Sequence, residues 1–166
     1  AALFAVHVHP DFDATALRVA GFLLANGALG DGDAAGIRQK LIEADKIEAI
    51  VVLPRELFYT TDISVTLWVL NQNKRGGRWH DRKLRSRQGE VLFMDLRSWT
   101  DNPVKGEQKK KVMFSEEQIK RAVAIYHGWQ AEGTDGATYA EPELYRSVGI
   151  DKLRENGFSL VPSRYI

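Results

Sequence analysis

Four short apolar runs constrain most strongly what this chain can fold into. They cover residues 19–25, 47–53, 63–70 and 90–96. Runs of this length are typical of buried β-strands, because helices of globular domains usually need about 10–12 residues. The first run, VAGFLLA, is apolar throughout and predicts a strand that is buried on both faces.

Helical patterns alternate with these runs. Residues 34–45 repeat apolar side chains on one face, and Asp33 is placed to cap that helix. Ser115 and Gln118 resemble a capping box at the start of a second helix. A short third helix is expected over residues 151–156. The order strand, helix, strand, strand, strand, helix predicts an α/β fold or a mixed sheet.

The connections complete the expected organisation. Residues 54–62 are too few for a helical crossover, so strands 47–53 and 63–70 are either antiparallel neighbours or not neighbours. Residues 74–87 and 131–142 are expected to be loops, because turn-forming and polar residues dominate both stretches.

Composition excludes several classes of protein. The chain has 166 residues, enough for one ordinary domain or a large piece of one. Hydrophobic residues make up 44% and charged residues 27%, which excludes a disordered tail and a simple coiled coil. Cysteine is absent, so disulfides and thiolate sites are excluded, and we expect a reducing, cytoplasmic location. No apolar run reaches the roughly 18–20 residues of a membrane span, so we expect no membrane association.

Residues 74–87 concentrate positive charge that the net charge of +1 conceals. The stretch contains a single acidic residue, Asp81, and Trp79 lies within it. Neighbouring like charges repel unless a polyanion relieves them, so the stretch favours contact with nucleic acid over a merely solvated loop. The seven basic residues expected to bind DNA are Lys74, Arg75, Arg78, Arg82, Lys83, Arg85 and Arg87.

Two adjacent aromatic residues in the connection between expected strands form a second candidate site. Phe58 and Tyr59 offer a planar platform for a ligand or a base. The alternative is that both rings pack in the core.

Two further patterns indicate chemistry more weakly. His7 and His9 would share one face of a strand near two aspartates, as in a metal site, but nothing downstream is spaced to supply further ligands. Residues 27–36 are rich in glycine and precede a helix, as phosphate-binding loops do, but their aspartates would repel a phosphate. We therefore favour structural roles for both segments.

A family resemblance covers nearly the whole chain, from about residue 3 to residue 166. Its most specific segments are IRQKLIEADKIEAIVVLP, the following LFYTT and LWVLNQNK, and the tail NGFSLVPSRYI. In this order they closely resemble the C-terminal half of the modification subunit of type I restriction–modification systems. Those subunits are N6-adenine DNA methyltransferases that use S-adenosylmethionine (AdoMet).

The resemblance implies an α/β fold: the C-terminal half of a Rossmann-like methyltransferase sheet, with mixed parallel and antiparallel strands and flanking and C-terminal helices. It implies that residues 1–100 form the sheet part and residues 101–166 a C-terminal helical extension. In the family, the AdoMet loop and the Asn-Pro-Pro-aromatic motif lie N-terminal to the region that this chain resembles. The Asn-Pro-Pro motif is absent here, since none of the five prolines adjoins another. The chain opens at Ala1 without Met and resembles a truncated segment that is inactive alone and binds no AdoMet itself.

The resemblance also implies roles and partners. By position, Phe58 stacks on a target adenine that has been flipped out of the duplex. The implied partners are DNA and the specificity and restriction subunits of the parent complex. Strand 19–25 would lack its neighbour in the parent sheet, so we expect two copies to pair through that strand or to exchange an N-terminal element. The alternatives are that residues 2–9 fold back over the edge or that the C-terminal helices cover it. The alternative interpretation is a non-catalytic module that binds nucleic acid or a specificity subunit.

Overall fold

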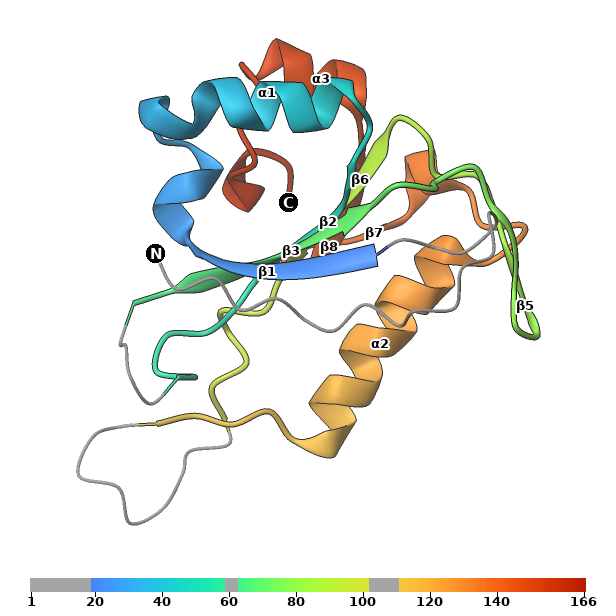
Figure 1. Cartoon of the computed structure of the whole chain (residues 1–166). Coiled ribbons are helices and arrows are strands. Elements are labelled where there is room, and N and C mark those ends of the chain that lie inside the picture. The colour runs from blue at the N-terminus through green and yellow to red at the C-terminus, as the bar shows by residue number, and fades with distance from the viewer. Residues whose placement is uncertain (1–18, 59–62, 102–110) are drawn as a thin grey trace.

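A six-stranded mixed sheet forms the centre of the computed structural model, which describes residues 19–58, 63–101 and 111–166 (Figure 1). The strands lie in the order β1-β3-β2-β6-β8-β7. Among these neighbours only β2 and β6 are parallel, which confirms the predicted α/β fold with a mixed sheet. Their bounds are β1 (Val19–Ala25), β2 (Ile47–Val52), β3 (Val65–Asn71), β6 (Glu90–Asp95), β7 (Ala140–Glu141) and β8 (Tyr145–Gly149).

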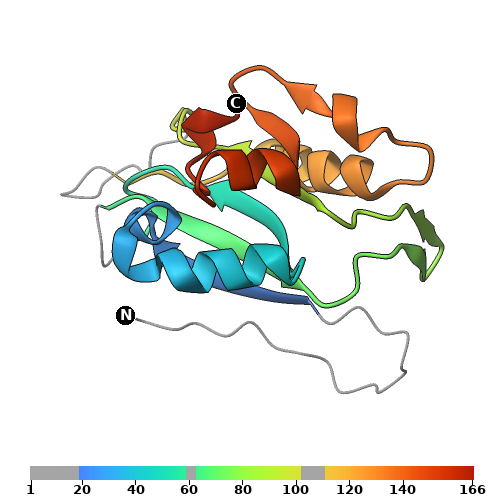
Figure 2. The same cartoon turned by 90° about the horizontal axis from the view of Figure 1, so that it is seen from above.

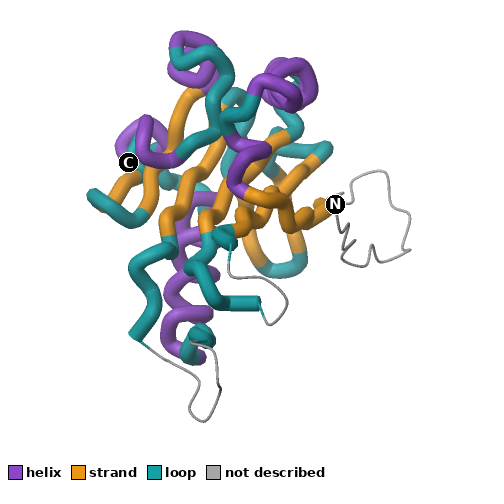
Figure 3. The backbone as a smooth tube through the Cα atoms, turned by 90° about the vertical axis from the view of Figure 1, so that its left-hand side faces the viewer, coloured by secondary structure: helices purple, strands orange, loops and turns teal. Residues whose placement is uncertain are grey.

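Helices cover both faces of this sheet. Figure 1 shows α1 (Ala35–Glu43) and α3 (Ile150–Glu155) on one face and α2 (Glu116–Gln130) on the other, and Figures 2 and 3 show the arrangement from two further sides. The short 3-10 helices are η1 (Asn26–Leu29), η2 (Gly32–Ala34), η3 (Gly136–Thr138) and η4 (Pro162–Arg164). The described helices fall short of the length and apolarity that a bilayer crossing demands.

The predicted capping box begins α2. The Gln118 N–H donates to the Ser115 hydroxyl at 3.2 Å, and the Ser115 N–H donates to the Gln118 side-chain oxygen at 2.8 Å. These two bonds satisfy donors that the first turn of a helix otherwise leaves unpaired. The sequence therefore located the start of α2 correctly.

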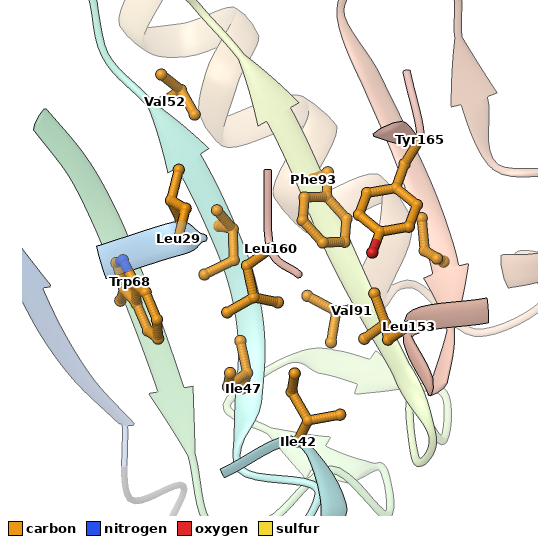
Figure 4. Close-up of a cluster of buried hydrophobic side chains, with 12 residues drawn as sticks. Leu29, Ile42, Ile47, Val52, Trp68, Val91, Phe93, Leu153, Leu160 and Tyr165 are labelled. Atoms are coloured by element: carbon orange, nitrogen blue, oxygen red, sulfur yellow. The ribbon is translucent and has the colours of Figure 1, made fainter. Parts of the chain in front are cut away.

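Two hydrophobic clusters fill the space between the sheet and its helices. The cluster on the α1 side contains Phe93 and its neighbours (Figure 4), and the cluster on the α2 side contains the fully buried Trp129. Successive residues of β2 alternate between them, with Ile50 in the first cluster and Val51 in the second. A strand with cores on both faces has no position for a solvated side chain, which explains the nearly continuous apolar run of β2.

The strand directions define two ends of the sheet. β3 is antiparallel to both β1 and β2, so β1, β2 and β6 run in the same direction. The strands β2 and β3 are therefore antiparallel neighbours, one of the two arrangements that their short connection allows. We call the end where β1, β2 and β6 finish the carboxyl end of the sheet, and the opposite end the amino end.

The strand β1 differs from the fully buried strand expected from its sequence. Phe22 and Leu24 pack on the α1-side cluster and Leu23 on the α2-side cluster, but the interior residues of β1 are only half-buried. Within the described residues, β1 pairs with β3 alone and lies at the edge of the sheet. A continuous apolar run indicates that both faces of the strand contact apolar side chains. It does not indicate how many strands pair with that strand.

Several elements depart from the expected loops and caps. The hairpin of β4 (Gly77–Trp79) and β5 (Arg82–Leu84) replaces the loop expected in the basic stretch. Part of the loop expected over residues 131–142 forms η3 and β7. Asp33 lies within η2, and the first turn of α1 receives no side-chain cap, so the expected Asp33 cap is wrong.

The expected helical extension over residues 101–166 also supplies two strands. β8 pairs with β6, and β7 pairs with β8, so the sheet continues past residue 100. The sequence of β8, YRSVG, contains no long apolar run. The strand conformation of β8 therefore depends on its hydrogen-bonded pairing with β6, and the pattern of a single sequence does not reveal this pairing.

Candidate functional site

The residue that the resemblance assigns to base stacking lies at the carboxyl end of the sheet. Phe58 follows β2 after a turn in which Glu56 has a φ of 65°. A left-handed backbone is unfavourable for a residue with a Cβ atom, and such residues persist only where surrounding contacts hold them.

Contacts from residues 111 and 112 hold this turn. Lys111 is 4% exposed, and its Nζ donates to the Phe58 carbonyl oxygen at 3.0 Å. The Val112 N–H donates to the Glu56 carbonyl oxygen at 3.2 Å. The Phe58 side chain is half-buried and packs against the α2-side cluster, as Leu57 also does. The core contact that we kept as an alternative is therefore real for Phe58, whereas Tyr59 lies outside the described residues.

An open hollow of about 360 Å³ lies at the same end of the sheet. The Thr66 hydroxyl donates to Asn26 Oδ1 at 2.6 Å and fixes the orientation of that side chain. In open α/β sheets, ligands bind outside the carboxyl ends of the strands, so this end is the candidate site. The residues that line the hollow are Ala25, Asn26, Gly27, Arg55, Ile63 and Ser64.

The basic stretch begins at the opposite, amino end of the sheet, and its first residue is internal. Lys74 is 3% exposed, and its Nζ contacts Asp45 Oδ1 at 2.5 Å. The same ammonium donates to the carbonyl oxygens of Ile47 at 2.9 Å and Glu90 at 2.6 Å. These are the first residues of β2 and β6, so Lys74 ties the end of β3 to two neighbouring strands.

Arg87 is also internal, and Glu48 is its acidic partner. Neither side chain is exposed, and Arg87 Nε donates to Glu48 Oε1 at 2.9 Å. Glu48 also accepts hydrogen bonds from the side-chain amides of Gln130, at 2.8 Å, and Asn71. Glu48 stands in an otherwise apolar strand, and such an isolated charge is the sequence signal that could have revealed a buried pair.

Arg85 completes the set of internal basic residues. Its Nη2 donates to Glu90 Oε2 at 2.7 Å, and its Nε donates to the Trp129 carbonyl oxygen at 2.6 Å. The Ser147 hydroxyl donates to the same Glu90 oxygen at 3.0 Å. Arg85 therefore links the residue after β5 to β6 and α2, and Ser147 of β8 binds the same carboxylate.

These contacts bear on the expected DNA-binding set. Asp45, Glu90 and Glu48 pair with Lys74, Arg85 and Arg87, and Lys74 and Arg87 are buried, whereas Arg85 is partly buried. DNA contact by the seven basic residues stays a prediction. The basic residues that the structure leaves on or beside the hairpin surface are Arg75, Arg78, Arg82 and Lys83.

Burial and pairing alter the pKa values of two groups in this network. Burial lowers the pKa of Lys74, and the hydrogen bond and charge of Asp45 oppose this effect only in part. Burial alone would raise the pKa of Glu90, but the hydrogen bond and charge of Arg85, together with the Ser147 hydrogen bond, lower it below 4.5. The ionised form of Glu90 therefore stabilises the folded state.

The Glu90 interactions predict a pH dependence of stability. The folded state depresses the pKa of Glu90, so its contribution is fully present above about pH 4.5 and is lost as the pH falls through the folded-state pKa. Urea unfolding at pH 7, 5, 4 and 3 measures this loss. Glu90→Gln is expected to be less stable than the wild type at pH 7 and to lose less stability below pH 4.5. Parallel pH profiles for the two proteins would contradict the prediction.

The remaining candidate segments show no binding chemistry in the described part of the chain. His7 and His9 lie outside the described residues, and no group of three or more His, Cys, Asp or Glu residues within the described ranges could hold a metal ion. Residues 27–36 form η1, η2 and the start of α1, and the buried Arg38 donates to the Ala28 and Asp31 carbonyl oxygens at 3.0 and 2.8 Å.

Comparison with known families identifies the chain. A model of the N-6 DNA methylase family matches residues 13–166. The chain belongs to this family. It is 33% identical over 149 residues to the type I restriction enzyme HindI methylase subunit of Haemophilus influenzae, and 32% identical over 148 residues to the MjaIX methylase subunit of Methanocaldococcus jannaschii. The alignments cover 87% and 89% of this chain but 29% and 24% of those methylase subunits.

Solved methylase structures share the fold. The methyltransferase subunit of the type I restriction–modification system from Streptococcus thermophilus superimposes with a TM-score of 0.65 at 21% identity, over 89% of this chain and 26% of that one. The type I restriction enzyme EcoKI M protein gives a TM-score of 0.56 at 18% identity, over 86% and 33% of the two chains. The resemblance to type I modification subunits is thereby confirmed for both family and fold.

Proposed function

We propose that this chain supplies the C-terminal half of the catalytic sheet of an AdoMet-dependent adenine-N6 DNA methyltransferase subunit of a type I restriction–modification system. The observation that carries the proposal is the constrained turn after β2, which holds Phe58 at the carboxyl end of the sheet in a chain of the N-6 DNA methylase family. In that role the chain contributes base positioning, and the rest of the parent protein contributes the methyl donor site.

Phe58 supports this role through its exposure and its fixed main chain. A base that leaves the duplex loses the stacking of its neighbours, and an aromatic face in the enzyme replaces it. Phe58 is half-buried and packs on the α2-side cluster, while Lys111 Nζ donates to its carbonyl oxygen. A residue held in this way loses little conformational entropy when a base binds.

The described residues that line the hollow at the carboxyl end include no carboxylate, so they offer no charged partner to the ammonium group of AdoMet. We therefore assign no step of methyl transfer to residues of this chain, and AdoMet belongs to the parent protein in our proposal.

Calorimetric titration and complementation test this division of labour. Titration of the chain with AdoMet is expected to give no measurable binding. Adding the N-terminal part of a type I methylase subunit in trans, with the specificity subunit, is expected to restore transfer of tritiated methyl groups to DNA adenine. Micromolar AdoMet affinity of the chain alone, or methylation without the added part, would contradict the proposal.

The proposed partners follow from the same role. We expect DNA and the specificity and restriction subunits as partners in a cytoplasmic complex, and the edge of β1 is the position for a further strand of the parent sheet. Pairing of two copies through this edge, measured by light scattering across a dilution series, stays a prediction for the chain alone.

A second candidate function, a non-catalytic module that binds nucleic acid or a specificity subunit, is favoured by the β4–β5 hairpin.

A further inference from the structure

The β4–β5 hairpin is fastened to the body of the protein at its base. The Arg85 N–H donates to the Gln130 carbonyl oxygen at 2.9 Å, and the Glu132 N–H donates to the Lys83 carbonyl oxygen at 3.2 Å. Leu84 is buried, and Arg82 Nη2 donates to Gln130 Oε1 at 3.1 Å. Together with the contacts of Lys74, Arg85 and Arg87, these contacts join β5 and the residues that flank the hairpin to α2 and the sheet. A ribbon held in this way points in a fixed direction.

The tip of the hairpin carries cationic and aromatic side chains that the body of the protein does not cover. Trp79 is 39% exposed, and its ring lies edge-to-face with the exposed His80 at 4.8 Å. The turn is constrained, because His80 has a φ of 51° and Arg78 Nε donates to the His80 carbonyl oxygen at 3.1 Å. Trp79 belongs to neither of the two hydrophobic clusters, so its exposed part is available for an external contact.

Three basic residues on this ribbon remain able to contact a partner. Arg75 and Arg78 are exposed. Lys83 contacts Glu132 at 3.3 Å, but both side chains are 65% exposed, and such a pair contributes little and exchanges readily for another anion. Asp81 is the acidic residue of the tip itself. Positive charge therefore prevails on the surface even after the internal residues are set aside.

The hairpin and Phe58 lie at opposite ends of the sheet. Lys74, where the hairpin segment begins, contacts the first residues of β2 and β6, whereas Phe58 follows the last residue of β2. Figures 1 and 2 show the hairpin (green) and the turn after β2 (teal) on opposite sides of the molecule. Six residues of β2 separate the two ends, which corresponds to about 20 Å. A duplex at the Phe58 end would thus meet the hairpin only about six or more base pairs away.

We propose that the β4–β5 hairpin is a second contact to duplex DNA, remote from the target base, in which Arg75, Arg78 and Lys83 bind phosphates and Trp79 packs against a sugar or a base edge. The inference rests on the proposed function, which makes duplex DNA the substrate. A two-stranded antiparallel ribbon fits the major groove, and phosphate contacts fix the register of a protein on the duplex. The contact lengthens the footprint of the enzyme without participating in base flipping.

Salt-dependent DNA binding tests the proposal. The full-length methylase subunit that carries this chain, assembled with its specificity subunit, is titrated onto a fluorescent 40-base-pair duplex at several salt concentrations. The triple variant Arg75→Ala, Arg78→Ala, Lys83→Ala is expected to flatten the log–log slope of affinity against salt by up to about 2.7, at about 0.9 per lost phosphate contact. Trp79→Ala is expected to weaken binding severalfold at an unchanged slope.

A charge-matched control separates this contact from general attraction. The triple variant Lys40→Ala, Lys120→Ala, Lys152→Ala removes the same charge from exposed positions on α1, α2 and α3, and it is expected to keep the wild-type slope. Equal slopes for the wild type and the hairpin variant would overturn the proposal, as would a hairpin variant that loses only its affinity for the specificity subunit. Methylation by the wild type is measured in parallel to distinguish two failures. If the wild type neither methylates nor binds DNA, the proposed function is wrong. If methylation is normal but the salt slope of the hairpin variant equals that of the wild type, only this inference is wrong.

Discussion

Glu48→Ala is expected to lower the free energy of unfolding by about 3–5 kcal/mol. The substitution leaves the Arg87 guanidinium buried without its carboxylate, and it also removes the acceptor of the Gln130 and Asn71 side-chain amides. One nitrogen of that guanidinium, Nη2, already lacks a hydrogen-bond partner among the described residues. Removing one member of a buried pair costs far more than the pair contributes, because the remaining charge stays out of water.

Two further variants identify the cause of that loss. Glu48→Gln keeps an acceptor but not the charge and is expected to lose less stability than Glu48→Ala. The double variant Glu48→Leu, Arg87→Met leaves no buried charge and is expected to be more stable than Glu48→Ala. Urea unfolding followed by circular dichroism measures all three. A loss below about 1 kcal/mol for Glu48→Ala would show that water reaches the pair in solution.

Phe58→Ala is expected to reduce kcat/KM for adenine methylation by about 5- to 150-fold in the complete methyltransferase. The estimate converts a stacking contribution of about 1–3 kcal/mol per base into a rate ratio. Methyl transfer from labelled AdoMet to duplex DNA measures it. A 2-aminopurine at the target position is expected to become brighter with Phe58→Ala, because its ring loses a stacking partner.

Neighbouring substitutions separate stacking from stability. Phe58→Tyr keeps an aromatic face and is expected to retain most activity. Leu57→Ala removes a side chain that packs on the same cluster as Phe58, and it is expected to affect stability more than methylation. Lys111→Met removes the hydrogen bond to the Phe58 carbonyl group and is expected to raise KM more than it lowers kcat. Equal losses for Leu57→Ala and Phe58→Ala would assign Phe58 to the core alone.

Local patterns in the sequence determined most of the sheet. The four apolar runs became β1, β2, β3 and β6, because burial between two clusters leaves a strand no position for solvated residues. The capping box located the start of α2, since that signal depends on residues only three positions apart. The short connection after β2 restricted β2 and β3 to antiparallel neighbours or to strands that are not neighbours, and they are antiparallel neighbours. The segments that resemble type I modification subunits indicated the methylase family, which the comparison confirmed.

The tertiary structure alone decided which of the charged residues are available to a partner. In the sequence, the basic residues of 74–87 are equivalent cations with Asp81 as the one acid among them, and Glu90 follows the stretch by three residues. In the fold, carboxylates from β2, from the residues before it and from β6 reach three of them, because neighbouring strands bring distant positions within about 3 Å. Electrostatic energy depends on distance and burial rather than on sequence separation. For the same reason, only the fold could place β8 beside β6 and set the hairpin and Phe58 at opposite ends of the sheet.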